Sequence, residues 1–250
     1  MERFKKIDSL GLKLIAVIAM MLDHMCYTVI PGNIWMTWVG RIAFPIFAFL
    51  IVEGYFHTKN VKKYALRLLI FALISEVPFD MMMTASLFYP FKQNVYWTLL
   101  IGLLVIWAID KPFNELVNAQ NQMERSKKMV RLVIIGFAAI ALGCLAALIG
   151  FTDYHYWGVL TILMFYLLRG KTYIQLIALA LINNFIGGME YVYTFFGMEQ
   201  TFPVQLMAIF AMIPIAMYNG EKGYEGKGIQ YAFYAFYPLH MLFLFLLMAF

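Results

Sequence analysis

Long apolar stretches separated by short polar segments recur along the whole chain, and they constrain its fold more than any other feature. Of the 250 residues, 63% are hydrophobic and only 13% are charged. A soluble domain averages roughly 45–50% apolar and about 25% charged residues, so this chain has too few charged side chains to cover a water-facing surface. We therefore expect a polytopic membrane protein, with lipid as the solvent for most of the chain.

The apolar stretches predict an all-α bundle of about nine transmembrane helices that forms one domain over residues 1–250. A helix that crosses a bilayer needs about 20 mostly apolar residues, with a range of about 17–25. The stretches 62–77 and 156–168 are short, so the expected count is nine, give or take one. The predicted spans are 12–30, 34–55, 62–77, 94–109, 130–150, 156–168, 172–188, 203–219 and 231–250.

The basic residues predict how these spans are oriented. With the N-terminus in the cytoplasm, every lysine and arginine except Lys92 and Arg41 falls in an inner segment or at the helix end beside it. This pattern follows the positive-inside rule and predicts a cytoplasmic N-terminus, an outer C-terminus and a location in the cell membrane. The net charge of +5 forms no single basic face, which argues against nucleic-acid binding. The predicted outer loops carry aromatic residues such as Trp38 and Tyr191, which suit the headgroup level.

The N-terminal segment and the two cysteines support two smaller expectations. The chain starts with basic residues followed by an apolar run, as a signal peptide does. This run continues to Ile30 without a small-x-small cleavage site, so we interpret it as a retained first span. Cys26 and Cys144 both lie inside apolar stretches, where we expect two core residues rather than a disulfide.

Several ionisable and amide side chains lie inside the predicted spans, where they are costly and by default mark a functional site. A helical rise of about 1.5 Å per residue puts them at similar depths, from the midplane into the outer half of the membrane. We therefore expect a shared polar cavity that carries the catalytic groups. These residues are Asp23, His24, Arg41, Glu76, Asn94 and His240.

Asp23 and Arg41 are expected to form a salt bridge between the first two spans. The pair also has a purely structural interpretation, in which it only fixes the order of the helices. Asp23 is adjacent to His24 in sequence, so its side chain points about 100° away on the helix and is not expected to orient the imidazole. The candidates for orienting His24, all from other helices, are Glu76, Asn94 and His240.

Lys13 and His24 lie eleven residues apart in the first predicted span. Eleven helical residues turn through about 1100°, so both side chains lie on one face, about 16.5 Å apart along the axis. This arrangement suits a long ligand whose phosphates bind the lysine at the interface and whose reactive end meets the histidine. Acetyl-CoA has that shape. The spacing alone is a weak indication, because any lysine and histidine at this separation satisfy it.

The spacing resembles the Arg/Lys-x10-His motif of the transmembrane acyltransferase family three, and the wider pattern resembles the TraX family. The resemblance covers the first hundred residues densely and then the last span, while the middle of the chain is similar mainly in hydropathy. A lysine at position 13, where many acyltransferases of family three have arginine, keeps the charge but loses the bidentate phosphate contact. The matching stretches are LKLIAVIAMMLDH (12–24), GRIAFPIFAFLIVEGYFHTKN (40–60), KYALRLLIFALISEVPFD (63–80), NVYWTLLIGLL (94–104) and YPLHMLFLFL (237–246).

The type member of the TraX family acetylates the N-terminus of conjugative pilin, so the resemblance implies an acetyltransferase. The expected reaction moves an acetyl group from cytoplasmic acetyl-CoA to an outer amine or hydroxyl, on pilin or on a surface glycan or peptide. His24 is the expected general base, with transient acetylation of its ring as the alternative. The residues expected to bind the CoA phosphates are Lys13, Lys63 and Arg67, with Lys62 as a weaker candidate.

Two other classes of protein stay open as alternatives to an enzyme. Ion-coupled transporters also bury charge pairs, but this sequence has no repeated halves and an odd number of predicted spans. A non-enzymatic assembly factor for a surface structure is the second alternative, since it can keep the family's residues without the activity. The sequence identifies neither the acceptor nor the oligomeric state, and it predicts no metal site.

Overall fold

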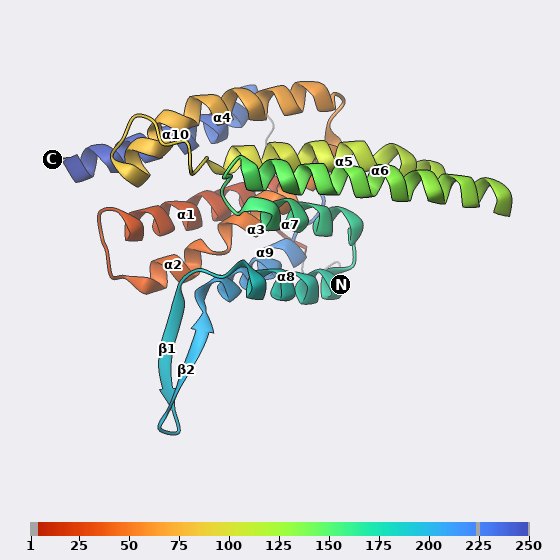
Figure 1. Ribbon diagram of the computed structural model, residues 1–250. Helices are drawn as coiled ribbons and strands as arrows, with labels where there is room; N and C mark the ends of the chain where they lie inside the picture. The colour runs from red at the N-terminus through yellow and green to blue at the C-terminus, as the bar shows by residue number, and fades with distance from the viewer. Residues whose placement is uncertain (1–4, 224–225, 250) are drawn as a thin grey trace.

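The computed structural model describes residues 5–223 and 226–249, and each predicted span coincides there with one helix or with two consecutive helices. The helices form an elongated bundle with one β-hairpin projecting from its side (Figure 1). The elements are α1 (Ser9–Tyr27), α2 (Ile34–Gly40), α3 (Ala43–His57), α4 (Val61–Thr84), α5 (Val95–Val117), α6 (Gln122–Ile149), α7 (His155–Leu167), α8 (Thr172–Ile186), β1 (Glu190–Phe195), β2 (Met198–Pro203), the 3₁₀ helix η2 (Val204–Ala211), α9 (Met212–Ala216) and α10 (Lys227–Ala249).

Within the described part of the chain, five helical segments are long and apolar enough to cross a membrane. One of them, Ile34–His57, joins α2 and α3. α4 has a comparable length of 24 residues but contains several charged side chains, which lower its hydropathy. The predicted helical membrane protein is therefore confirmed, whereas the count of about nine spans stays a prediction. The five segments are Ser9–Tyr27, Ile34–His57, Val95–Val117, Gln122–Ile149 and Gly228–Ala249.

Aspartate or asparagine side chains cap the start of four helices. Asp8 accepts a hydrogen bond from the Gly11 N–H at 2.8 Å and begins α1. Asn60, Asn94 and Asn121 do the same for α4, α5 and α6. The short polar segments between the apolar stretches therefore satisfy N–H groups that the first helical turn leaves without partners.

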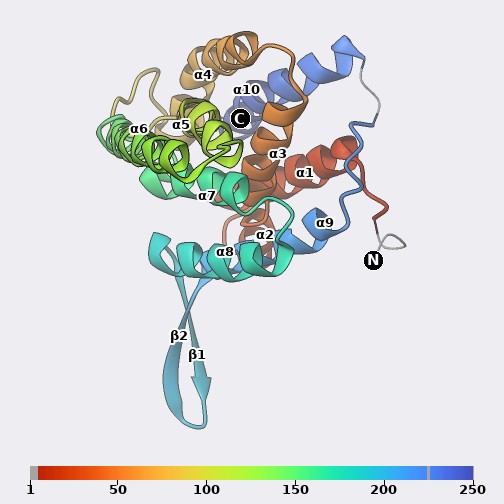
Figure 2. The same cartoon turned by 90° about the vertical axis from the view of Figure 1, so that its right-hand side faces the viewer.

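The core of the bundle lies around α5, which packs against α3, α4, α6 and α7. Leu103 and Ile106 of α5 and Ile162 of α7 are fully buried there. α10 comes from the far end of the sequence but packs along α4 and against α1 (Figures 1 and 2). This crossing brings the first and last helices together. By contrast, α6 leaves large apolar side chains such as Phe137 exposed, as a lipid-facing helix does.

The hairpin of β1 and β2 is the one element, among the described residues, that differs from the all-α expectation. Its tyrosines were expected in an outer loop, yet the segment has an aromatic residue at every second position from Tyr191 to Phe195, which is the period of a strand. Phe196 and Gly197 connect the strands with φ of 50° and 78°. Two consecutive positive φ angles match the tight hairpin turn that follows the twist of paired strands.

Candidate active site

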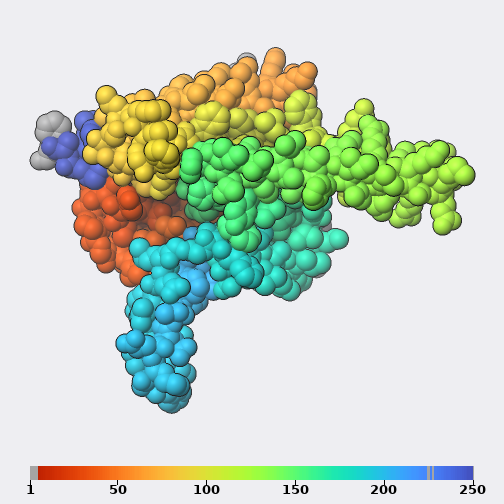
Figure 3. Space-filling view, viewed as in Figure 1, coloured from red at the N-terminus to blue at the C-terminus, as the bar shows by residue number. Residues whose placement is uncertain are grey.

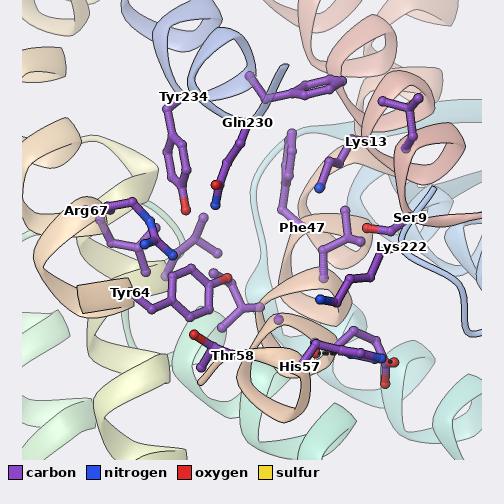
Figure 4. A pocket seen from close by; sticks show the side chains of 18 of the residues that line it. Ser9, Lys13, Phe47, His57, Thr58, Tyr64, Arg67, Lys222, Gln230 and Tyr234 are labelled. Atoms are coloured by element: carbon purple, nitrogen blue, oxygen red, sulfur yellow. Dashed lines mark hydrogen bonds and ion pairs between the residues drawn. The ribbon is translucent and has the colours of Figure 1, made fainter. Parts of the chain in front are cut away.

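A cavity of about 460 Å³ opens at the end of the bundle where α1, α4 and α10 begin and α3 ends. Figure 4 shows side chains from these helices and from the segment before α10 around it. Part of its wall is apolar, including Phe47 of α3 and Phe233 of α10. The polar part of the wall consists mainly of Ser9, Thr58, Tyr64, Gln230, Tyr234 and charged groups. A cavity of this size and mixed lining suits a small-molecule ligand.

The charged residues around this cavity are mainly basic. Its only carboxylate among the described residues belongs to Glu53, which accepts hydrogen bonds from Arg169 at 2.8 and 3.3 Å and is thereby compensated. Lys13 and Lys222 point into the cavity from one side and Arg67 from the opposite side (Figure 4). The cavity therefore suits an anion with several negative charges.

Arg67 is held by its aromatic neighbours. Its guanidinium lies 5.5 Å from the ring centre of Tyr64, and Tyr234 lines the cavity beside it (Figure 4). Its Nε atom is buried, with no hydrogen-bond partner among the described residues. A buried donor of this kind is satisfied when a ligand supplies an acceptor.

The predicted phosphate-binding residues divide into two groups. Lys13 and Arg67 line the cavity, whereas Lys63 is exposed in the first turn of α4 and does not line it. Sequence analysis missed Lys222, because its position depends on a distant backbone contact. Residues 217–221 pair with Ile7 and with Ser9, the first residue of α1, through three hydrogen bonds. These are Ile7 N–H to Met217 C=O at 3.1 Å, Asn219 N–H to Ile7 C=O at 2.9 Å and Ser9 N–H to Glu221 C=O at 2.9 Å.

His24 of α1 contacts His240 of α10, so one of the three predicted candidates lies against its ring. The two rings are nearly parallel, and His24 Nδ1 lies 2.7 Å from His240 Nε2. His240 Nδ1 lies 2.9 Å from the carbonyl oxygen of Phe236, so this nitrogen carries the proton. A neutral His240 then accepts at Nε2, and His24 donates from Nδ1. This assignment leaves His24 Nε2 unprotonated and able to accept a proton.

A narrow apolar neck lies between the cavity and the histidine pair. A pocket of about 30 Å³ adjoins the cavity and shares Phe47, Tyr96 and Phe233 with its wall. On the far side it is lined by Met20, one turn before His24, and by Tyr237, whose ring centre lies 5.5 Å from that of His240. The two histidines do not line either space. For a ligand bound in the cavity, this neck is the adjoining space on the side of the histidines.

Pro238 helps to connect α10 to α5 beside this neck. Proline has no N–H, so the carbonyl oxygen of Tyr234, four residues earlier, has no helical partner there. The hydroxyl of Tyr96 donates to that oxygen at 3.2 Å. The missing helical bond thus becomes a contact between two helices that line the neck.

The expected salt bridge between Asp23 and Arg41 is present. Arg41 donates from Nη2 to both carboxylate oxygens, at 2.8 and 2.9 Å, and from Nη1 to Gln205 at 3.3 Å. Gln205 in turn donates to Asn183 at 2.9 Å. This chain of contacts joins α1, the α2–α3 link, η2 and α8. Sequence analysis missed Gln205, although its place inside a predicted span is the same signal that singled out the other polar residues.

Glu76 and Asn94 contact each other rather than the histidine pair. Glu76 accepts hydrogen bonds from the Asn94 backbone at 3.1 Å, its side-chain amide at 2.5 Å and the Trp97 indole at 2.8 Å. Asn94 also donates to the carbonyl oxygen of Ala72 at 2.8 Å and caps α5. These bonds use both donors of its amide, so the pair fixes α4 to the start of α5.

Comparison with known proteins gives one family and one relative, each matched over nearly the whole chain. The model of the family described as "TraX protein" matches residues 9–248. A relative named "Probable fimbrial assembly protein FimC, serogroup H1", from Dichelobacter nodosus, is 28% identical over 266 residues. That alignment covers 96% of this chain and 96% of the relative. No solved structure matches the chain.

Removing both partners of the Asp23–Arg41 pair is expected to destabilise the fold less than the sum of the two single removals. Asp23→Ala or Arg41→Ala leaves one charge without its counter-charge in a partly buried site, which costs about 3 kcal/mol. The melting temperature in detergent should therefore fall less in the double variant than the sum of the two single losses. Lys128→Ala, which breaks the surface pair with Glu124, is the control and should change it little. Strictly additive losses would contradict the coupling.

Proposed function

The chain belongs to the TraX family, and from this premise we propose that it is an integral membrane acetyltransferase. It moves an acetyl group from cytoplasmic acetyl-CoA to an amine or hydroxyl on the other side of the membrane. One observation carries the proposal. A basic cavity is followed by an apolar neck and then by a pair of histidines, and one of these, His24, has an unprotonated ring nitrogen. The printed name of the relative, a fimbrial assembly protein, supports a pilus subunit as the acceptor.

Lys13, Arg67 and Lys222 are suited to bind the phosphates of the donor. They converge on one space from two sides, and the guanidinium of Arg67 offers a planar pair of donors that matches a phosphate group. About 16.5 Å of helix axis separates Lys13 from His24. The uncharged arm and thioester of the donor match both this distance and the apolar lining of the neck.

The histidine pair is suited to move the proton. In the proposed step, the acceptor nitrogen or oxygen attacks the thioester carbonyl carbon, and His24 Nε2 takes the acceptor's proton. The C–S bond breaks, and the leaving thiolate receives that proton from His24. While His24 is protonated, its Nδ1–H donates to His240, which the Phe236 carbonyl oxygen keeps in the accepting tautomer. Attack by His24 itself, with transient acetylation, is the alternative route.

The proposal includes the predicted topology of about nine spans with a cytoplasmic N-terminus. In that orientation the cavity opens to the cytoplasm, where acetyl-CoA is made, because the start of α1 and the end of α3 line it.

Single cysteines introduced at Lys59 and at Lys92 test this orientation in intact cells, in a background without native cysteines. An impermeant thiol reagent should label position 92 and leave position 59 unlabelled. The reverse pattern would contradict the orientation.

Replacement of His24 is expected to abolish catalysis without loss of donor binding. His24→Ala removes the proton acceptor, so the rate of acetyl transfer in proteoliposomes should fall by about 10²–10⁴-fold, while CoA affinity stays unchanged. His240→Ala should lower kcat more than it changes KM, because His240 positions the base. The control is His155→Asn outside the site, since asparagine tolerates the positive φ of 45° at that position. Undiminished turnover in His24→Ala would rule out His24 as the base.

Two basic residues of α4, one turn apart, allow a matched test of the donor site. Arg67→Ala removes a cation that lines the cavity, whereas Lys63→Ala removes an exposed one. Loss of a charge-assisted hydrogen bond costs about 1.5–3 kcal/mol, so CoA affinity measured by calorimetry should fall at least tenfold in Arg67→Ala and in Lys13→Ala. Lys63→Ala should keep the original affinity. Equal affinities in all three variants would remove the phosphate assignment.

A further inference from the structure

The two faces of the hairpin differ sharply in polarity. Residues directly opposite each other in an antiparallel pair lie on the same face, so the observed register separates the two sets. Only Gln200, opposite Tyr193, is polar on one face. That face, the aromatic face, consists of Tyr191, Tyr193, Phe195, Met198, Gln200 and Phe202. The other, the acidic face, consists of Glu190, Val192, Thr194, Glu199, Thr201 and Pro203.

The aromatic face is largely uncovered by the rest of the molecule. Phe195 is 58% exposed and Met198 is 61% exposed. The hairpin stands clear of the bundle in the space-filling view (Figure 3). Contiguous exposed apolar surface of this kind marks a site of contact with another molecule or with lipid.

The tip of the hairpin has a strained backbone that the fold alone does not explain. Phe196 has φ of 50°, a region where a bulky side chain is uncommon and where asparagine is favoured at this position of a hairpin turn. Its ring is 88% exposed and packs only on Phe195 among the ring contacts of the described residues. Strain without a compensating contact inside the fold indicates a function for this side chain.

The direction of the hairpin suggests what covers it. Its long axis is nearly perpendicular to the long helices in two views taken 90° apart (Figures 1 and 2). Where those helices cross a bilayer, the hairpin runs parallel to the membrane plane. Tyr191, at its base, packs edge to face on Trp38 of α2 with ring centres 5.5 Å apart, and α2 also exposes Trp35 and Val39. The aromatic face is thus continuous with exposed apolar surface of the bundle, at residue types that favour a membrane interface.

We propose that the hairpin lies flat in the lipid interface beside the bundle, with its aromatic face toward the acyl chains and its acidic face toward water. Phe196 at its tip anchors it there. The headgroup region suits a two-stranded hairpin, because the outer edges of its strands keep backbone groups that need water as a partner. The carboxylates of Glu190 and Glu199 oppose deeper insertion.

Nitroxide labels on the two faces test this placement independently of acetyl transfer. Single cysteines replace Tyr193 or Phe195 on the aromatic face, and Thr194 or Thr201 on the acidic face, in a variant without Cys26 and Cys144. The labelled full-length proteins are placed in phosphatidylcholine nanodiscs. We expect labels at 193 and 195 to collide with oxygen but not with a nickel chelate, and labels at 194 and 201 to show the reverse.

Two outcomes would overturn the proposal. Nickel access to both faces would mean that the hairpin stands in water, and shielding of positions 193 and 195 from both reagents would mean that protein covers them.

Phe196→Asn is the second test, since asparagine suits the turn and removes the ring. It should raise nickel access at position 195 at least twofold, whereas Phe88→Asn in another exposed loop should not. Unchanged access in Phe196→Asn would contradict the anchor.

Discussion

The hydrogen bond between His24 and His240 joins the first and last long helices of the chain, and the arrangement of the site depends on it. The 2.7 Å contact requires α10 to pack against α1, which also brings the start of α10 to the wall of the basic cavity. The Phe236 carbonyl oxygen then sets the protonation of both rings through one further contact. This one pair of side chains thus sets the position of the proposed catalytic nitrogen, His24 Nε2, and leaves it unprotonated.

Lipid as a solvent explains why most of the other polar side chains predicted for the site bind one another across two or more helices. A polar side chain inside an apolar bundle has no water to bind, so it must find a partner from another helix. Arg41 joins Asp23 to Gln205, and Glu76 joins α4 to the start of α5. These two sets hold helices together and have few groups left to offer a ligand. The cavity differs, because its cations outnumber the carboxylates that face it.

Local patterns in the sequence predicted the elements and some of the contacts, whereas distant packing determined the rest. Apolar periodicity located the helices, and the cost of a buried charge predicted the pair of Asp23 and Arg41. The sequence left three candidates beside His24, because the angular position of one helix relative to another is set by packing. Lys63 and Arg67 lie one turn apart on the same side of α4, and only the packed bundle shows that Arg67 lines the cavity whereas Lys63 is exposed. The hairpin was not predicted, because aromatic residues at the headgroup level fit an outer loop as well as a strand.

Density for bound CoA, from electron cryo-microscopy of the protein in nanodiscs at saturating ligand, tests the central claim most directly. The account predicts phosphate groups within hydrogen-bond distance of Lys13, Arg67 and Lys222, and an arm that passes between Phe47 and Phe233 toward His24. CoA bound elsewhere, or a cavity that stays empty at saturation, would contradict it.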